Sequence, residues 1–237
     1  EKGKNIPLYT YELMQGQVDY GRNADPPPRI WIEKKSGKRE VFNGLGIEQT
    51  KDDPITAIEF VNGGIGMTPE DAVIDRHGGG EDTLGMHGHG TTVSLCYLTK
   101  LGMPVSIRSH YRGNTWSGRT SLKTTESGVA KILHLDGKWE KDSEPKNTVF
   151  RVENPTATMI KDLSRAGQYF IYANPKYPGA VLVPKDENTD TKIPNAVAIR
   201  SGQVQCVEGI VSEAYDKKGE CDTVFVDGLA MKDVDYS

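Results

Sequence analysis

Two glycine-rich segments, each followed by an expected helix, are the part of this sequence best suited to hold a ligand. Residues 63–67 read Gly-Gly-Ile-Gly-Met and come directly after the apolar run 58–61, whereas residues 85–90 read Gly-Met-His-Gly-His-Gly. Glycine has no Cβ, so the backbone can lie close to a bound molecule, and the free N–H groups at the start of a helix attract phosphate. The two segments together predict a nucleotide pocket.

The residues after the first glycine segment form a strong helix start. Thr68 can cap the helix, Pro69 suits its first position, and Glu70 and Asp71 lie near the positive end of the helix dipole. The helix is expected to be short, and residues 76–86 are expected to form a lid.

Periodicity and turn residues predict the elements that position these segments. Helices are expected at 7–20, 69–77, 91–101 and 155–166, and strands at 29–33, 40–42, 55–61, 105–109, 115–123, 129–135 and 148–152. Short strand-like runs follow at 169–172, 180–183, 196–199, 204–211 and 223–226. Residues 156–237 are therefore expected to form a β-rich appendage or extra strands of the first sheet. The last of these runs lies close to the chain end, which suggests that the chain begins a longer protein.

Composition and charge exclude several classes of partner. The 237 residues include 29 Lys and Arg against 33 Asp and Glu, and a net charge of −4 gives no clear nucleic-acid signal. No apolar run reaches membrane-spanning length, so no membrane partner is expected.

The three cysteines are odd in number and far apart, which favours reduced thiols in a cytoplasmic protein. Cys96 is expected in the core, on a helix stripe with Val93 and Leu101.

The order of elements and the two glycine segments resemble the GHKL superfamily of ATP-binding domains. That superfamily includes DNA gyrase B, MutL, a heat-shock chaperone and histidine kinases. Residues 64–70 are similar to its Asp-Asn-Gly-Ile-Gly-Met box, residues 85–90 to its second glycine box, and residues 12–19 to its Glu-Leu-Ile-x-Asn-Ser-x-Asp box. The resemblance covers about residues 8–155. It implies an α+β, Bergerat-type fold, in which helices cover one face of a mixed, mostly antiparallel sheet, as a first domain at 1–155.

The resemblance also implies roles for particular residues. Glu12 matches the glutamate that polarises the attacking water as general base. Gly16 stands where the family has the asparagine that holds magnesium, and Asn62 stands where it has the aspartate that accepts the adenine amine. Thr148 matches the threonine that supports that aspartate through a water. The implied nucleotide-binding residues are Gly16, Asp19, Asn62, Gly64, Gly66, Met67, His87, Gly88, His89, Gly90, Thr91 and Thr148.

The function implied is ATP binding with weak, magnesium-dependent ATP hydrolysis, coupled to lid closure and conformational switching. ATP or ADP is the expected ligand, and a homodimer is a possible assembly. Gly16 lacks a magnesium ligand and Asn62 lacks the carboxylate charge, so the alternative is a degenerate, non-hydrolysing nucleotide-binding or scaffold module. A histidine kinase fragment is a weaker alternative, since only eleven residues precede Glu12.

Two other clusters have both a functional and a structural interpretation. His77, His87 and His89 could hold zinc, contact phosphate from the lid, or be polar lid residues only. A basic cluster lies around the strand at 105–109 and is formed by Arg108, His110, Arg112 and Arg119. The structural interpretation, a solvated sheet edge, is the favoured one for this cluster.

Overall fold

The computed structural model describes most of the chain up to residue 173 and four short strands beyond it. The described residues are 8–21, 26–44, 47, 50–64, 66–73, 89–141, 146–173, 196–200, 203–207, 223–226 and 229–230. The expected lid at 76–86 and the expected strand at 180–183 lie outside these residues.

A seven-stranded sheet forms the centre of the described structure, in the order β2-β1-β3-β7-β4-β5-β6. Its strands are β1 (Arg29–Lys34), β2 (Arg39–Val41), β3 (Ile55–Asn62), β4 (Val105–Tyr111), β5 (Asn114–Thr124), β6 (Lys131–Lys141) and β7 (Thr148–Glu153). Every pairing between these strands is antiparallel, so the parallel pairs expected of a mixed sheet do not occur among them.

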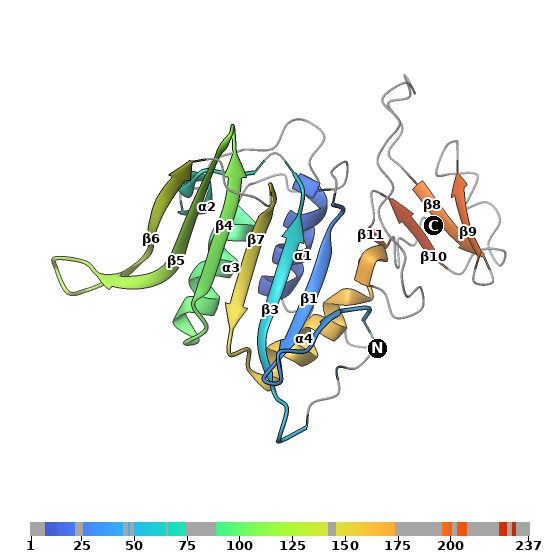
Figure 1. Cartoon of the computed structure of the whole chain (residues 1–237), viewed down its shortest axis with the longest axis horizontal. Helices are drawn as coiled ribbons and strands as arrows, with labels where there is room; N and C mark the ends of the chain where they lie inside the picture. The colour runs from blue at the N-terminus through green and yellow to red at the C-terminus, as the bar shows by residue number, and fades with distance from the viewer. Residues whose placement is uncertain are drawn as a thin grey trace.

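Helices cover one face of this sheet, giving an α+β architecture (Figure 1). They are α1 (Leu8–Gly21), α2 (Pro69–Val73), α3 (His89–Lys100) and α4 (Ala157–Gly167), with a short 3-10 turn, η1 (Ile171–Ala173). In Figure 1, α1, α3 and α4 lie behind the strands. Among the helices of the described part, none combines the length and apolar character needed to cross a membrane.

The core lies between the helices and the sheet because alternate strand residues point toward the helix layer. Ile58 and Phe60 of β3 and Val152 of β7 are almost fully buried, as are Leu13 and Met14 of α1. Strand side chains alternate between the two faces, so the intervening residues point to the other, open face. Several of these are charged, among them Glu33, Glu59 and Arg151.

The core continues past residue 155, because α4 and η1 pack into it. Tyr9 donates its hydroxyl to Asp162 Oδ2 of α4 at 2.7 Å, and Tyr172 donates to the Met14 carbonyl of α1 at 3.1 Å. Burial and the neighbouring Asp162 carboxylate raise the pKa of Tyr9 well above its ordinary value. The expected strand at 169–172 is wrong, since these residues form only an isolated bridge at Phe170 and part of η1.

A second, antiparallel sheet of four strands follows, in the order β11-β10-β8-β9. Its strands are β8 (Ala196–Arg200), β9 (Gln203–Val207), β10 (Thr223–Val226) and β11 (Leu229–Ala230). The residues that the structure describes beyond 195 all lie in these four strands.

Helix α3 buries a different face from the expected one. Leu95 and Leu98 are fully buried, whereas Val93 is 50% exposed and Leu101 is 49% exposed. Cys96 is only half-buried, so its expected place in the core beside Val93 and Leu101 is wrong.

One ion network joins three strands across the open face of the sheet. The Arg151 guanidinium binds both carboxylate oxygens of Glu33, at 2.8 and 2.9 Å, and one oxygen of Glu59 at 2.6 Å. This hydrogen bonding holds the pKa of Glu33 below its ordinary value. Arg151 thus ties β7 to β1 and β3 by side chains as well as by backbone.

Replacing this arginine is expected to destabilise the fold in a pH-dependent way. Arg151→Gln should lower the free energy of unfolding by about 1–3 kcal/mol at neutral pH, because two carboxylates lose their shared cation. The pKa of Glu33 is lower in the folded state than its ordinary 4.5, so the stabilisation is present above that pH and is lost as the pH falls through the folded-state value. Denaturant unfolding of both proteins at neutral and acidic pH measures this, and an unchanged difference would contradict it.

Candidate functional site

Four separate segments of the chain meet at one small pocket between the helices and the sheet. They are α1, the end of β3 with its following loop, the first turn of α3, and the start of β7. The lining residues are Leu13, Gly16, Gln17, Asn62, Gly66, Met67, Thr91, Thr148 and Phe150. The cavity measures about 20 Å³, which is room for one water molecule.

A chain of amide hydrogen bonds fixes the orientation of Asn62 in this pocket. The Gly64 N–H donates to Asn62 Oδ1 at 3.0 Å, and Asn62 Nδ2 donates to Gln17 Oε1 at 2.7 Å. Gln17 Nε2 then donates to the Leu13 carbonyl at 3.4 Å. A backbone N–H can only donate and a carbonyl can only accept, so these two ends fix the donor and the acceptor of each hydrogen bond in the series.

A second set of hydrogen bonds lies on the other side of the pocket. Ser109 Oγ of β4 accepts the Met67 N–H at 2.9 Å and lies 2.8 Å from Thr148 Oγ1. Thr148 pairs directly with Asn62 in the β3–β7 register. The hydroxyl of Thr148 therefore stands next to Asn62, held by Ser109.

The first glycine loop is pressed against β4 at Gly66. Its φ angle is +78°, which favours glycine, and a Cβ there would lie 1.8 Å from the His110 carbonyl oxygen. The adjacent Met67 carbonyl accepts a hydrogen bond from Trp116 Nε1. Gly66 and Met67 are thus held against β4 and β5, and Met67 lines the pocket.

Thr68 and Asp71 begin α2 as a capping box. The Thr68 N–H and hydroxyl both donate to Asp71 Oδ2, at 2.8 and 2.9 Å, and the Asp71 N–H donates back to Thr68 Oγ1 at 3.3 Å. The helix start at Pro69 is therefore confirmed.

Glu12 lies against the first turn of α3. A Cβ on Gly90 would be 2.0 Å from Glu12 Oε2 and 2.8 Å from its Cδ, so only glycine leaves room for this carboxylate. A negative charge here is favoured by the dipole of α3. Beside it, a Cβ on Gly16 would meet only Thr91 Oγ1, at 3.5 Å, which is an ordinary contact.

Most residues expected at the site are brought together, and some lie outside the described structure. Gly16, Asn62, Gly66, Met67, Thr91 and Thr148 line the pocket, while Gly64, Glu12 and Gly90 adjoin it. His87 and Gly88 lie outside the described residues, as does His77. Asp19 belongs to α1 and His89 begins α3, but their side chains are not described.

Ser109 is a polar residue of the site that was not expected from the sequence. Gln17 is 2% exposed, although it lies in a helix with other polar residues, and Ser109 is fully buried. Ser109 follows the alternation Val105, Ile107 on the buried face of β4, so a hydroxyl at an apolar position is the signal that identifies it.

A metal centre has little support in the described structure. Gly16 offers no side-chain oxygen where the resemblance places a magnesium ligand. Across the described ranges, no three His, Cys, Asp or Glu side chains gather as a metal-binding group.

Models of known protein families give no match to this chain, and neither do curated proteins. The interpretation of the pocket therefore rests on its residues and geometry.

Replacing Asn62 by aspartate is expected to destabilise the protein at neutral pH. Asn62→Asp removes the donor to Gln17, whose amide must then turn and face its oxygen toward the Leu13 carbonyl, costing about 1–3 kcal/mol. A protonated carboxylic acid can again donate to Gln17 Oε1, so the loss should shrink in acid and grow as the pH rises. Thermal unfolding of both proteins at mildly acidic and mildly alkaline pH tests this. A loss that does not change with pH would contradict the assigned direction of the hydrogen bonds.

The contact between Gly66 and β4 predicts an asymmetry between two glycines. Gly37 has a φ of +82° with no atom near its missing Cβ, so Gly37→Ala should cost about 1–2 kcal/mol from backbone strain alone. Gly66→Ala carries the same strain and also collides with the His110 carbonyl, so its cost should be clearly larger. Denaturant unfolding of the two variants measures the difference. Equal losses would show that the loop moves away from β4 at no cost.

Proposed function

We propose that this protein is an ATP-binding protein of GHKL type, with a Bergerat-type ATP site at the pocket between α1, α3 and the ends of β3 and β7. One observation carries the proposal. The three motifs that resemble GHKL boxes lie far apart in the sequence, and residues of all three converge at this pocket or its rim. A strand-to-helix turn alone would not bring α1 and the start of α3 to the same place.

The purine would lie beside Asn62. Its Nδ2 has one hydrogen beyond the one given to Gln17, and its Oδ1 can accept one bond beyond that from Gly64. These groups suit the exocyclic amine and neighbouring ring nitrogen of adenine. The cavity of about 20 Å³ is too small for a base, so the lining side chains must move on binding. Met67 is unbranched and polarisable, which suits such a movement.

The phosphates would lie at the first turn of α3, where backbone N–H groups and the helix dipole favour anions. Glu12 already places a carboxylate there, against Gly90. In this position it can orient a water toward the terminal phosphate and accept its proton. Without a nucleotide, the Glu12 carboxylate supplies the negative charge at the N-terminus of α3.

The described residues do not fit a dedicated magnesium site. Oxygen ligands are what Mg²⁺ requires, and Gly16 supplies none. Thr91 has the hydroxyl nearest to the missing side chain of Gly16, and among the described residues no three His, Cys, Asp or Glu side chains gather as a metal-binding group. No catalytic step is therefore assigned to the metal.

The second candidate is a nucleotide-binding module that does not hydrolyse ATP. It is favoured by Gly16 and by the amide chain through Asn62. The Asn62 amide in this series of hydrogen bonds is neutral, whereas an ionised carboxylate at the same position would place a negative charge beside the base. Such a module would use the nucleotide as a conformational ligand only.

Calorimetry with ATP and a phosphate-release assay separate these candidates. Wild-type protein should bind ATP with a dissociation constant in the micromolar range or weaker. Glu12→Gln should bind ATP as tightly or up to about tenfold more tightly, because a carboxylate no longer competes with phosphate, and it should lose hydrolysis. Glu126→Gln, at an exposed loop position, is the matched control.

Each result decides one point. No binding of ATP by the wild type would overturn the proposed function. Binding without phosphate release would favour the second candidate, and hydrolysis that survives Glu12→Gln would remove the assigned role of Glu12. Gly16→Asn has room for its side chain and should strengthen binding only when magnesium is present.

A further inference from the structure

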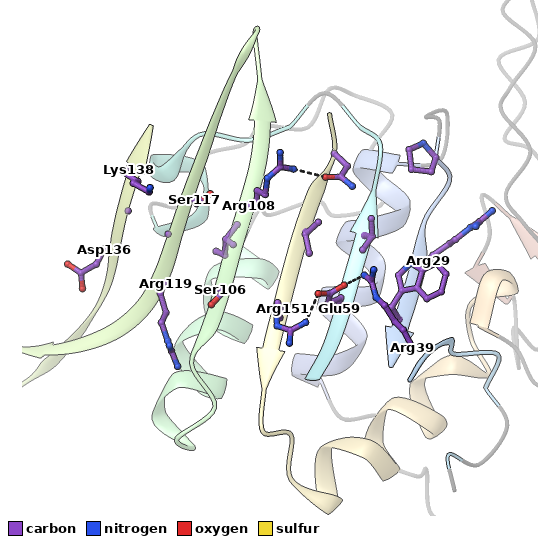
Figure 2. Close-up of a pocket in the computed structure, with 18 of the residues that line it drawn as sticks. Arg29, Arg39, Glu59, Ser106, Arg108, Ser117, Arg119, Asp136, Lys138 and Arg151 are labelled. Atoms are coloured by element: carbon purple, nitrogen blue, oxygen red, sulfur yellow. Dashed lines mark hydrogen bonds and ion pairs between the residues drawn. The ribbon is translucent and has the colours of Figure 1, made fainter. Parts of the chain in front are cut away.

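The pocket between the helices and the sheet is lined by neutral residues, whereas the charged side chains of the sheet lie on its other face. Figure 2 shows that open face, where Arg39 and Arg151 both bind Glu59 of β3. Val61 lines the groove on the open face, and the next residue, Asn62, lines the pocket. Among the described residues that line the pocket, none is charged. A base in the pocket would therefore be selected by the donors and acceptors of neutral groups.

The amide of Asn62 can match two kinds of purine, depending on its orientation. Adenine has a donor at position 6, its amine, next to an acceptor at ring nitrogen N1, whereas guanine and hypoxanthine have an acceptor at position 6 next to a donor at N1. An amide has one donor side and one acceptor side, and rotation about the last side-chain bond exchanges them. Asn62 can therefore distinguish the two kinds of base only if its orientation is fixed.

Two hydrogen bonds fix this orientation. The Gly64 N–H requires an acceptor and binds Asn62 Oδ1 at 3.0 Å, whereas Gln17 Oε1 requires a donor and binds Asn62 Nδ2 at 2.7 Å. Gln17 cannot turn without directing its own oxygen at the Leu13 carbonyl, to which its Nε2 donates at 3.4 Å. Asn62 and Gln17 are both 2% exposed, so water does not readily replace a lost partner. The opposite orientation of Asn62 would therefore cost two buried hydrogen bonds.

The hydroxyl groups of the pocket impose no such direction. Ser109 Oγ and Thr148 Oγ1 are 2.8 Å apart, and either of them can be the donor. A hydroxyl can rotate to donate or to accept, so Thr148 suits both kinds of base. Selection by the direction of hydrogen bonds thus depends on the two amides.

We propose that Gln17 determines the specificity of the pocket, because it holds Asn62 in the orientation that accepts from a 6-amino purine and disfavours a 6-oxo purine. This inference rests on the proposed function, in which adenine places its amine at Asn62 Oδ1. The ribose and phosphates would run to the first turn of α3, so the base cannot turn over to exchange its own donor and acceptor. Gln17 acts on the base through Asn62 and is a positioning residue.

Calorimetry with ATP and inosine triphosphate tests this role. The two nucleotides differ only at position 6 and in the proton on N1, and neither carries the 2-amino group of guanine. The wild type should bind ATP about 30-fold more tightly, because the inosine base must turn Asn62 against two hydrogen bonds that contribute about fivefold each. Gln17→Met keeps the length of the side chain and leaves only the Gly64 hydrogen bond, so the ratio of the two affinities should fall to about fivefold.

Two control variants separate orientation from packing. Gln17→Glu keeps an acceptor for Asn62 and, when protonated, a donor for the Leu13 carbonyl, so it should keep the wild-type ratio. Gln15→Met makes the same replacement at a half-buried position of α1 that is not among the described lining residues, and it should leave the ratio unchanged. Circular dichroism checks the folding of each variant. Gln17→Ala, which leaves space for a water that can donate or accept, should lower the ratio as Gln17→Met does and replaces it if that variant does not fold.

The affinity ratio compares two ligands of one protein, so a general loss of stability does not change it. A wild type that binds inosine triphosphate as tightly as ATP would overturn the inference. A wild-type ratio in Gln17→Met, or an equal fall in Gln17→Glu, would also overturn it while leaving ATP binding in place. If the wild type does not bind ATP at all, the proposed function itself is wrong, and the inference is overturned with it.

Discussion

The close packing of Gly66 on the His110 carbonyl is the constraint on which the rest of the site depends. Because no side chain separates the loop from β4, the next residue can bond Ser109 through its N–H and Trp116 through its carbonyl. This places Met67 in the pocket and starts α2 directly afterwards. Gly66 therefore lets the loop backbone pack against β4, and the pocket beside Met67 results from this packing.

The Asn62 amide pairs with the Gln17 amide and therefore has a structural role that a carboxylate would not fill. Gln17 and Asn62 are oriented by backbone groups at both ends of their hydrogen-bond chain, so changing either one alone reverses a bond or leaves a buried polar atom without a partner. The pair also makes the pocket neutral. A neutral pocket holds its shape without a ligand, whereas a buried charge would need compensation.

Local patterns predicted most of the described elements, but not always which face an element buries. The apolar run of β3 and the Thr68 helix start are short-range signals, and both elements are confirmed. The buried face of α3 was predicted wrongly because Val93 and Leu101 are apolar, whereas packing turns Leu95 inward. The run 169–172 has strand-forming residues, yet the core accepts Phe170 and Tyr172 at the end of the helix layer. The hydrogen-bond partners of Gln17 and Ser109 depend on tertiary contacts, although the alternation in β4 places Ser109 on the buried face.

The alternation of side chains at the end of β3 has a further consequence. Val61 and Asn62 are joined by one peptide group, so a displacement of the strand end toward one layer is a displacement away from the other. A ligand that moves the end of β3 on one face would therefore also move it on the opposite face. By thermodynamic reciprocity, whatever factor one ligand applies to the affinity of the other must be returned in equal measure. The end of β3 is therefore the element through which a change on one face of the sheet would reach the other face.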